Sequence, residues 1–368
     1  MDFSHILNYK NFGLKALFAL FLAFLSINTY ANQEQETVEH VVDGHENHAA
    51  ADEKFDPTVT ILHHISDAHS WHLWGHTSLP LPVILYTPNG LEVFSSAKLM
   101  DAHHEPIPYT GQYNTYINDH EHIKVLAADG TIDEAATSSI IDFSITKNVA
   151  AMFIAIALIL IVFISVAGSY KKRAGKAPKG LQSWLEPIIL FVRDDIARPN
   201  IGYKFEKFMP LLLTIFFFIW FNNLLGLVPI FPGSANVTGN IAITMVLALV
   251  VLVVVNVNGN KYYWAHIFKP DVPFWLLPIM WVVEIIGVFS KPFALMVRLF
   301  ANITAGHIIV LSLISLIFIF KTLAIAPVSV AFVLFMYVLE LLVAFLQAFI
   351  FTMLTALFIG TAVEEHHH

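Results

Sequence analysis

The sequence predicts an all-α polytopic membrane protein of about five membrane helices, preceded by a small β-containing domain. The chain has 368 residues, of which 57% are hydrophobic and 13% charged, and its mean hydropathy is +0.66. This composition is typical of membrane proteins rather than soluble enzymes. Residues 32–140 carry 17 acidic and 3 basic residues, whereas the whole chain has a net charge of −8. The chain therefore contains two regions that face different solvents.

Residues 1–31 are expected to form a cleavable secretory signal. Lys10 and Lys15 precede the apolar run 16–27, and residues 29–31 include the small residues that a cleavage site requires. A short retained membrane anchor is the alternative. Cleavage would leave the mature N-terminus outside the cytoplasm. Residues 32–57 are acidic, polar and poor in aromatics, so they are expected to be disordered.

Residues 58–142 are expected to form a small exported domain. The apolar runs 81–86 and 91–94 flank Pro88-Asn89-Gly90, which predicts a β-hairpin. The domain is rich in histidine: His63, His64, His69, His72, His76, His103, His104, His120 and His122. Imidazoles at this density could bind zinc or copper. Their spacing fits no closed ligand set, so we assign no metal site and expect solvated or packed side chains.

The membrane domain is expected to cover residues 143–363, and its first span is the charge-free run 148–170. Five basic residues lie between positions 171 and 179, so the positive-inside rule places this end in the cytoplasm. Residues 181–198 mix apolar residues at helical spacing with charges. This pattern predicts one amphipathic helix along the cytoplasmic interface.

Residues 208–260 contain no charged residue and are too long for one span. Pro229 and the sequence 231–233 interrupt the run, so we expect two spans, about 208–228 and 238–257, joined by a short outer loop. Asn222, Asn223 and Asn240 lie within these spans or at their ends. Such amides either join helices by hydrogen bonds or line a polar path, and the residues alone leave both open.

The apolar run 278–320 is long enough to cross a bilayer at a strong tilt. It contains Glu284, Lys291, Arg298 and His307. A charge in hydrocarbon costs about 2.5–3.5 kcal/mol on insertion scales, so such residues usually face a partner or a water path. On a helix, Glu284 lies about 20 Å from Arg298 toward one surface, and His307 about 13 Å from it toward the other. A fixed cation between two titratable groups indicates an ion path with a barrier in its middle.

The last expected helix covers residues 327–362 and is also long and tilted. Glu340 and Gln347 are its strongly polar residues, and their spacing puts them on one helix face, two turns apart. Residues 364–368 are expected to be a cytoplasmic tail.

The motif Ser-Lys-Pro-Phe-Ala-Leu-Met-Val-Arg-Leu-Phe-Ala-Asn-Ile-Thr-Ala-Gly-His at residues 290–307 closely resembles a signature of subunit a of the F-type ATP synthase. A second resemblance lies in Leu-Gln-Ala-Phe-Ile-Phe at residues 346–351, with Glu340 upstream. The resemblance covers about residues 145–363. Many members of that family carry an acid where this chain has Gly226, and this departure puts the lining of the outer channel in doubt.

The resemblance implies a non-catalytic stator subunit with two offset half-channels. These carry protons to and from carboxylates of a rotating c-subunit ring, and proton flow is thereby coupled to rotation and ATP synthesis. The implied partners are the c ring, the subunit b peripheral stalk, the rest of the ATP synthase complex and the lipid bilayer, with no nucleic acid. No cofactor is implied. The ion is H⁺, with Na⁺ as the alternative, because the c-subunit site decides it.

The resemblance also assigns residues to this path. Arg298 would stand between the half-channels, His307 and Glu340 would lie together in the outer one, and Glu284 would line the inner exit. The remaining candidates are Asn302 and Gln347, which would position Arg298 or water, and Asn223 and Asn240, which would line the outer channel. A buried structural ion pair is the alternative for His307 and Glu340. Glu284 could instead be an interfacial acid that extends toward water.

Two other classes of protein stay in view. A self-contained ion channel or secondary transporter with a metal-binding exported domain would favour inverted repeats and broken helices, which the sequence does not display. A metal-binding exported protein on a membrane anchor would need no buried arginine, and its histidine-rich domain would have to bind metal tightly when expressed alone. The sequence has no phosphate-cradling glycine loop, so we do not expect it to bind ATP. The expected location is a bacterial inner membrane, with the N-terminus periplasmic or extracellular and the C-terminus cytoplasmic.

Overall fold

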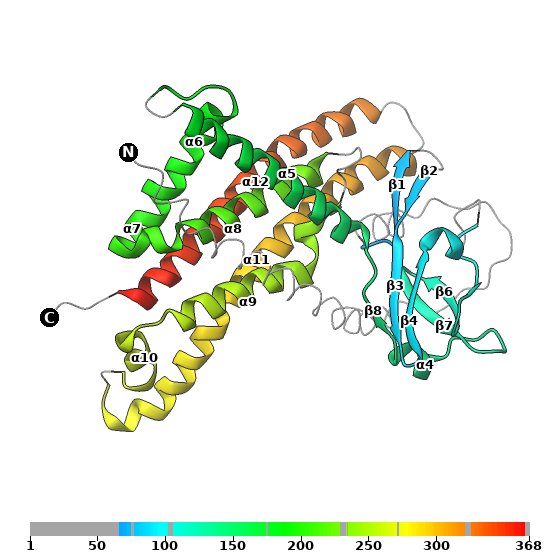
Figure 1. Cartoon of the computed structure of the whole chain (residues 1–368), viewed down its shortest axis with the longest axis horizontal. Helices are drawn as coiled ribbons and strands as arrows, with labels where there is room; N and C mark the ends of the chain where they lie inside the picture. Colours follow the sequence, from blue (N-terminus) through cyan, green and yellow to red (C-terminus); the bar gives the residue numbers. More distant parts are fainter. Residues whose placement is uncertain are drawn as a thin grey trace.

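A computed structural model describes residues 66–74, 77–101, 106–173, 176–228, 233, 235–270, 272–320 and 325–364. The expected signal peptide, the acidic segment and most of the expected tail lie outside the described residues. Within them, a helical bundle has a small β domain at one end (Figure 1). Four helices of this part are long and apolar enough to cross a membrane, or up to five if one bent pair counts as a span. This confirms the predicted fold class.

The N-terminal domain, residues 66–146, contains three small sheets. In the first, β1 (Ser70–Trp74) pairs with β2 (Thr77–Pro80). In the second, β3 (Pro82–Thr87) lies between β4 (Gly90–Ser95) and β8 (Ile141–Asp142). The third contains β5 (Tyr109–Thr110), β6 (Thr115–Asp119) and β7 (His122–Leu126), and the short helix α4 (Glu134–Ser138) follows it. The predicted hairpin forms between β3 and β4, with Thr87 opposite Gly90.

The sheets enclose a small apolar core made of the strand residues Val83, Leu85, Phe94, Tyr116 and Val125 and of Leu99, from the 3₁₀ turn that follows β4. Phe94 and Tyr116 stack with their ring centroids 5.6 Å apart. Sheets of this size are marginal alone, because few strands bury little apolar surface. The domain therefore depends on additional contacts, which come from a charged cluster and from the helical bundle.

A buried histidine with two carboxylates forms that charged cluster. His69 is 3% exposed; its Nε2 lies 3.5 Å from Asp142 Oδ2, and its Nδ1 lies 3.9 Å from Glu121 Oε2. Glu121 also accepts a hydrogen bond from the His69 backbone N–H at 3.0 Å. The β6–β7 turn that carries Glu121 has positive φ at His120 (47°) and Glu121 (66°). This conformation costs free energy for residues other than glycine, and it directs the Glu121 carboxylate to His69.

The cluster is charged at neutral pH. Burial by itself lowers the pKa of His69, but Asp142 and Glu121 outweigh it and raise the pKa to about 10. Burial would raise the pKa of Asp142, yet the contacts with His69 and Ser144 hold it below its usual range. An imidazolium therefore joins strand β8 to the β6–β7 turn and the start of β1.

Helix α8 (Phe205–Leu227) is the centre of the bundle. It contacts α5 (Lys147–Lys172) on one side and α12 (Ala326–Val363) on the other. Its aromatic residues fill both interfaces: Phe217 lies 4.7 Å from Phe163 of α5, and Phe216 lies 5.7 Å from Phe345 of α12, measured between ring centroids. Most of α8 is buried, which explains why its sequence is apolar on all faces.

The expected interfacial helix forms as three short pieces. Helix α6 (Leu181–Phe191) continues through a π-helical turn, η2 (Val192–Ala197), into α7 (Arg198–Ile201). These pieces lie at the end of the bundle far from the N-terminal domain (Figure 1). Arg193 there donates a two-pronged hydrogen bond to Asp194 at 2.9 and 2.8 Å. The charges of Arg193 and Asp194 are thus paired at the edge of the apolar bundle.

Helices α9 and α10 form the bent pair. A short 3₁₀ turn, η4 (Val237–Gly239), leads into α9 (Ile241–Val257), and α10 (Lys261–Phe268) follows at an angle of 101°. The bend has a local cause, since Asn260 caps α10 by accepting a hydrogen bond from Tyr263 N–H at 2.9 Å. Helix α9 has only 17 residues, about 26 Å at 1.5 Å per residue, so it barely spans hydrocarbon alone.

The last two helices are long, as predicted. Helix α11 (Leu277–Phe320) has 44 residues and α12 has 38, or about 66 and 57 Å at 1.5 Å per residue. Both exceed a bilayer core of about 30 Å, so they cross it at a tilt or extend beyond it. Large apolar side chains are exposed along them, among them Phe289, Phe293, Phe332 and Leu342, each 56% exposed or more. These faces contact lipid or another subunit.

The His69 cluster yields a stability prediction. The pKa of His69 in the folded protein lies above 6.5, its value in the unfolded chain. The contribution of His69 to the stability of the domain is therefore complete below pH 6.5 and is lost as the pH rises through about 10. His69→Gln should leave the two carboxylates unpaired and destabilise the domain by about 3–5 kcal/mol at pH 7. Hydrogen–deuterium exchange of β3 and β6 in the intact chain, corrected for intrinsic exchange, measures the pH dependence of stability and the effect of His69→Gln. His120→Asn, which removes a histidine whose side chain is 76% exposed, should leave exchange unchanged. Native exchange that does not vary between pH 7 and 10 would contradict the charged cluster.

Candidate functional site

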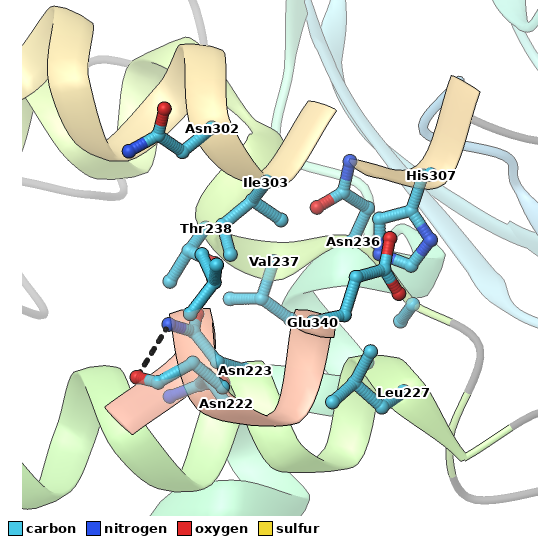
Figure 2. A pocket seen from close by; sticks show the side chains of 14 residues that line it. Asn222, Asn223, Leu227, Asn236, Val237, Thr238, Asn302, Ile303, His307 and Glu340 are labelled. Carbon is cyan, nitrogen blue, oxygen red and sulfur yellow. Dashed lines mark hydrogen bonds between the residues drawn. The ribbon is translucent and has the colours of Figure 1, made fainter. Parts of the chain in front are cut away.

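A polar cavity lies between four segments of the bundle, near the end that carries the N-terminal domain. Its volume is about 20 Å³, enough for one or two water molecules, and it is lined by residues of α8, η4, α11 and α12 (Figure 2). Its polar lining residues are Asn222, Asn223, Asn236, Thr238, Asn302, His307 and Glu340. Burying so many polar groups in an apolar bundle costs free energy unless they form hydrogen bonds to each other or to water. Polar residues at membrane depth are therefore usually functional. The cavity is therefore the first candidate for a site.

His307 and Glu340 come together in this cavity, as predicted from the two motifs. Figure 2 shows the Glu340 carboxyl group next to the His307 ring, with the two residues contributed by α11 and α12. Glu340 Oε1 is buried and has no hydrogen-bond partner within the described chain. A buried carboxyl oxygen of this kind is a group that water satisfies. The pair is thus not a closed salt bridge.

Two glycines make room for this pair. A Cβ atom at Gly306 would collide with the Glu340 carboxyl group, so the carboxyl group lies directly against the α11 backbone. A Cβ atom at Gly226 would lie 3.8 Å from His307 Nε2 and 3.2 Å from the Ala235 carbonyl oxygen. An acid at position 226 would therefore point at His307. In this chain the carboxyl group beside His307 comes from Glu340 instead, and Gly226 still lines the cavity.

Asparagines and a threonine complete the polar wall. Thr238 donates a hydrogen bond to Asn223 Oδ1 at 2.5 Å, and the Asn223 amide donates to the Ala344 carbonyl at 3.4 Å. Asn223 is 4% exposed and ties η4 to α12. The side-chain oxygens of Asn222 and Asn236 are buried without a partner in the described chain. With Glu340 Oε1, they give the cavity three acceptors that require water.

Asn240 occupies a different place from the one its prediction implied. It does not line the cavity; its side chain caps α9 by accepting a hydrogen bond from Ala242 N–H at 2.9 Å. Its amide group donates to Asp67 of the N-terminal domain at 3.4 Å. Asn240 therefore lies at the rim, directly after the η4 turn that lines the cavity.

Arg298 is exposed on α11 and is not among the residues that line the cavity. Its neighbours Leu295 and Leu299 are 2% and 1% exposed and hold the helix against the bundle, whereas Arg298 itself is exposed. Within the part of the chain that the structure describes, its guanidinium makes no hydrogen bond or ion pair. An arginine within an apolar helix normally has a partner.

The other predicted residues are spread over α11 and α12. Glu284 lies near the far end of α11, where its Oε1 is 3.7 Å from His266 Nδ1 and its side chain is 24% exposed. Asn302 lines the cavity one turn from Arg298. Gln347 is 3% exposed, packed within the bundle and outside the cavity lining. The structure thus joins His307, Glu340, Asn223 and Asn302, and separates them from Glu284.

Sequence reasoning did not identify Asn236 and Thr238 as lining residues. They follow the break at residues 231–233 and look like ordinary loop residues. Their place in the wall depends on η4 folding back between α8 and α11, which local sequence does not determine. Among the described residues there is no group of three or more histidine, aspartate or glutamate side chains arranged to hold a metal ion. Several histidines of the N-terminal domain lie outside those residues.

These features define a multi-pass membrane protein with a titratable polar cavity and an isolated arginine in its apolar helices. A family model described as "ATP synthase A chain" matches residues 149–360, which is more than half of the chain. The chain therefore belongs to the ATP synthase A chain family. A second model, described as "Domain of unknown function (DUF8433)", matches residues 60–143.

Similar proteins share the membrane region. The chain is 51% identical over 232 residues to ATP synthase subunit a of Chloroherpeton thalassium, covering 62% of this chain and 69% of that protein. It is 49% identical over 235 residues to ATP synthase subunit a 2 of Prosthecochloris aestuarii, covering 62% and 71%. Subunit a of Myxococcus xanthus is 45% identical over 235 residues, covering 62% and 76%.

Gly306 provides a test of the cavity. Gly306→Ala should displace the flexible end of Glu340 without unfolding α11, because the colliding atoms belong to a movable side chain. We expect proton transport by the assembled ATP synthase to fall by about tenfold, as for a misplaced proton-transfer group. Gly287→Ala on the same helix, where a Cβ meets nothing within 4 Å, should transport protons normally. Equal activity in the two variants would show that Glu340 need not stay in place.

Proposed function

We propose that the chain is the membrane stator subunit of a rotary ATP synthase. In this proposal it carries protons through two offset half-channels to and from carboxylates of a c-subunit ring, and so couples proton flow to ring rotation and ATP synthesis. It is not an enzyme by itself, and it needs no cofactor. The observation that carries the proposal is Arg298, exposed on the face of a membrane helix between a polar cavity and a distant carboxylate.

Arg298 is the barrier between the two half-channels. A guanidinium stays protonated under ordinary conditions, so it attracts an ionised carboxylate on a neighbouring subunit but passes no proton onward. Each ring carboxylate that reaches Arg298 is therefore held in its deprotonated form, and no proton leaks directly from one side to the other. Asn302, one turn away, and Gln347 position water or the guanidinium.

The cavity with His307 and Glu340 is the outer half-channel. A histidine near neutral pH both accepts and donates a proton, and the adjacent carboxyl group holds it in place. The unpartnered oxygens of Asn222, Asn236 and Glu340 support a water-filled path. Asn223 fixes the wall of this path through Thr238.

Glu284 lies at the inner half-channel. From Glu284 to His307, α11 advances 23 residues, about 34 Å, close to the thickness of a bilayer core. Arg298 lies between these two groups along the helix. This separation supports two half-channels that open to opposite sides, with transfer between them only through the ring.

The proposed orientation follows from charge. Lys171, Lys172 and Arg173 end α5 at the side opposite the N-terminal domain, and basic residues favour the cytoplasm. The N-terminal domain then lies in the periplasm or outside the cell, and Glu284 lies on the cytoplasmic side. The partners are the c ring at the exposed face of α11 and α12, the peripheral stalk of subunit b, and a bacterial inner membrane.

A self-contained channel or transporter fits these observations less well. Such a protein encloses its charged residues between its own helices, whereas Arg298 faces away from them. The predicted rotary role requires a second protein at this face, which the exposed apolar residues of α11 and α12 also favour.

Removal of the barrier cation tests the proposal. Arg298→Ala should abolish ATP-driven proton pumping in inverted membrane vesicles while the complex still assembles. Arg298→Lys should also fail to couple, because a buried lysine loses its proton far more easily than an arginine. Arg173→Ala, which removes an exposed arginine at the end of α5, serves as the control and should pump normally. Unchanged pumping by assembled Arg298→Ala would rule out the half-channel mechanism.

The pairing of His307 with Glu340 makes a separate prediction. His307→Gln and Glu340→Gln should each lower pumping by about tenfold or more, since each removes a proton-transfer group. The double exchange of His307→Glu with Glu340→His keeps both groups in the cavity, so it should pump better than His307→Glu alone or Glu340→His alone. Such non-additivity is the signature of residues in direct contact. If the losses simply multiply in the exchanged variant, the two residues act independently.

A further inference from the structure

The N-terminal domain places a carboxylate, Asp67, against the helices that form the cavity rim. Thr146 donates its hydroxyl hydrogen to Asp67 Oδ2 at 2.9 Å, and the Asn148 backbone N–H donates to Oδ1 at 3.0 Å. The side chain of Asn240 donates to Oδ2 at 3.4 Å. Asp67 thus contacts the first turn of α5 and the cap of α9 at once. It is the point where the domain meets the polar end of the bundle.

The domain is fixed in this position by more than one contact. Trp71 of β1 is 1% exposed and belongs to the same apolar cluster as Val149 and Met152 of α5. The Lys147 backbone N–H donates to the Ala68 carbonyl oxygen at 2.8 Å. Asp67 therefore lies on a segment, residues 67–71, that is anchored to α5 at both ends. Its carboxylate has a defined place at the rim rather than a mobile one.

A series of ionisable groups continues from Asp67 toward the cavity. Lys147 lies within electrostatic range of Asp67 on one side and of His307 on the other. Asn240, which binds Asp67, directly follows η4, whose Val237 and Thr238 line the cavity. Helix α5 also contacts η4. Asp67 therefore lies at the same end of the bundle as the His307–Glu340 pair, next to the η4 turn that lines the cavity and outside the lining itself.

We propose that Asp67 is the outermost proton-carrying carboxylate of the outer half-channel, supplied by the N-terminal domain. This rests on the proposed function of the membrane region and extends its proton path by one group. A proton from external water binds the Asp67 carboxylate to give the neutral acid. It then passes through water to His307 or Glu340, and Asp67 returns to its ionised form. Burial raises the pKa of Asp67, with opposing hydrogen bonds from Asn148 and Thr146, which favours transient protonation.

Two variants, Asp67→Asn and Asp67→Glu, distinguish a proton-carrying role of Asp67 from a purely structural one, because the two roles predict opposite orders of severity. Asp67→Asn keeps nearly the same shape and one oxygen acceptor for the Asn148 N–H, but it binds no proton. Its NH₂ group replaces Oδ2, so the Thr146 hydroxyl must turn to accept a hydrogen bond and the bond from Asn240 is lost. Asp67→Glu keeps the titrating group and changes the length of the side chain. If Asp67 only clamps the domain to α5, Asn is the milder change. If Asp67 carries protons, Glu is the milder change.

The test measures proton flux into right-side-out vesicles that contain the assembled membrane sector, driven by a potassium diffusion potential. Flux is expressed per amount of the chain in the purified complex. Asp67→Asn should lower it by about tenfold, and Asp67→Glu should restore more than half of the native flux. Asp133→Asn is the matched control, because Asp133 also caps a helix of this domain, through a 2.9 Å hydrogen bond from Ala136 N–H, but away from the bundle.

Native flux in assembled Asp67→Asn would overturn the proposal, as would equal losses in Asp67→Asn and Asp67→Glu. If Asp67→Asn does not assemble, the pH profile of flux in the native chain and Asp67→Glu decides. The groups that face Asp67 from the packed elements, Lys147 and His69, are the same in both. A shifted half-maximal pH is expected because the titrating group differs, and coincident profiles would refute the assignment.

The same preparations separate this proposal from the one it rests on. Normal ATP-driven pumping by Arg298→Ala would defeat the stator function itself. Loss of pumping by Arg298→Ala, with native flux in Asp67→Asn, would defeat only the role of Asp67.

Discussion

The organisation of the membrane region depends on one constraint, the cost of a permanently charged guanidinium in an apolar helix. Leu295 and Leu299 hold α11 against the bundle, and Arg298 between them faces outward. In the proposed function, the cost of that charge, about 2.5–3.5 kcal/mol or more, is offset when a carboxylate of the c ring approaches. A subunit with this feature is incomplete alone, which agrees with its membership of the ATP synthase A chain family.

In the proposed mechanism, the polar cavity and the N-terminal domain meet a second constraint, the delivery of protons to an apolar site. Glycines at 226 and 306 allow His307 and Glu340 to lie side by side, and unpartnered amide oxygens provide places for water. The domain is joined to this end of the bundle through Trp71 and Asp67. Its charged His69 cluster stiffens the strands that carry these residues. The small β domain is therefore held in a defined position beside the polar end of the bundle.

Much of this could be predicted from sequence because apolar length, charge clusters and two motifs are local signals. The hairpin at Pro88-Asn89-Gly90, the long helices and the meeting of His307 with Glu340 were predicted and are found. The cap role of Asn240 and its contact with Asp67 could not be predicted, because they join residues 173 positions apart. The approach of Gly226 to His307 likewise depends on how the helices pack, which local sequence does not determine. The mechanism in the half-channels and the cleavage of residues 1–31 stay predictions.

The most direct test of the central claim is cross-linking at the Arg298 face. The chain has no cysteine, so Val297→Cys, at a position 39% exposed, introduces a single reactive thiol beside Arg298. The account predicts a disulfide with a cysteine placed next to the membrane carboxylate of the c subunit in the assembled complex. Ile161→Cys on α5, 68% exposed, should form none. A cross-link at α5 and none at α11 would contradict the claim that Arg298 faces the ring.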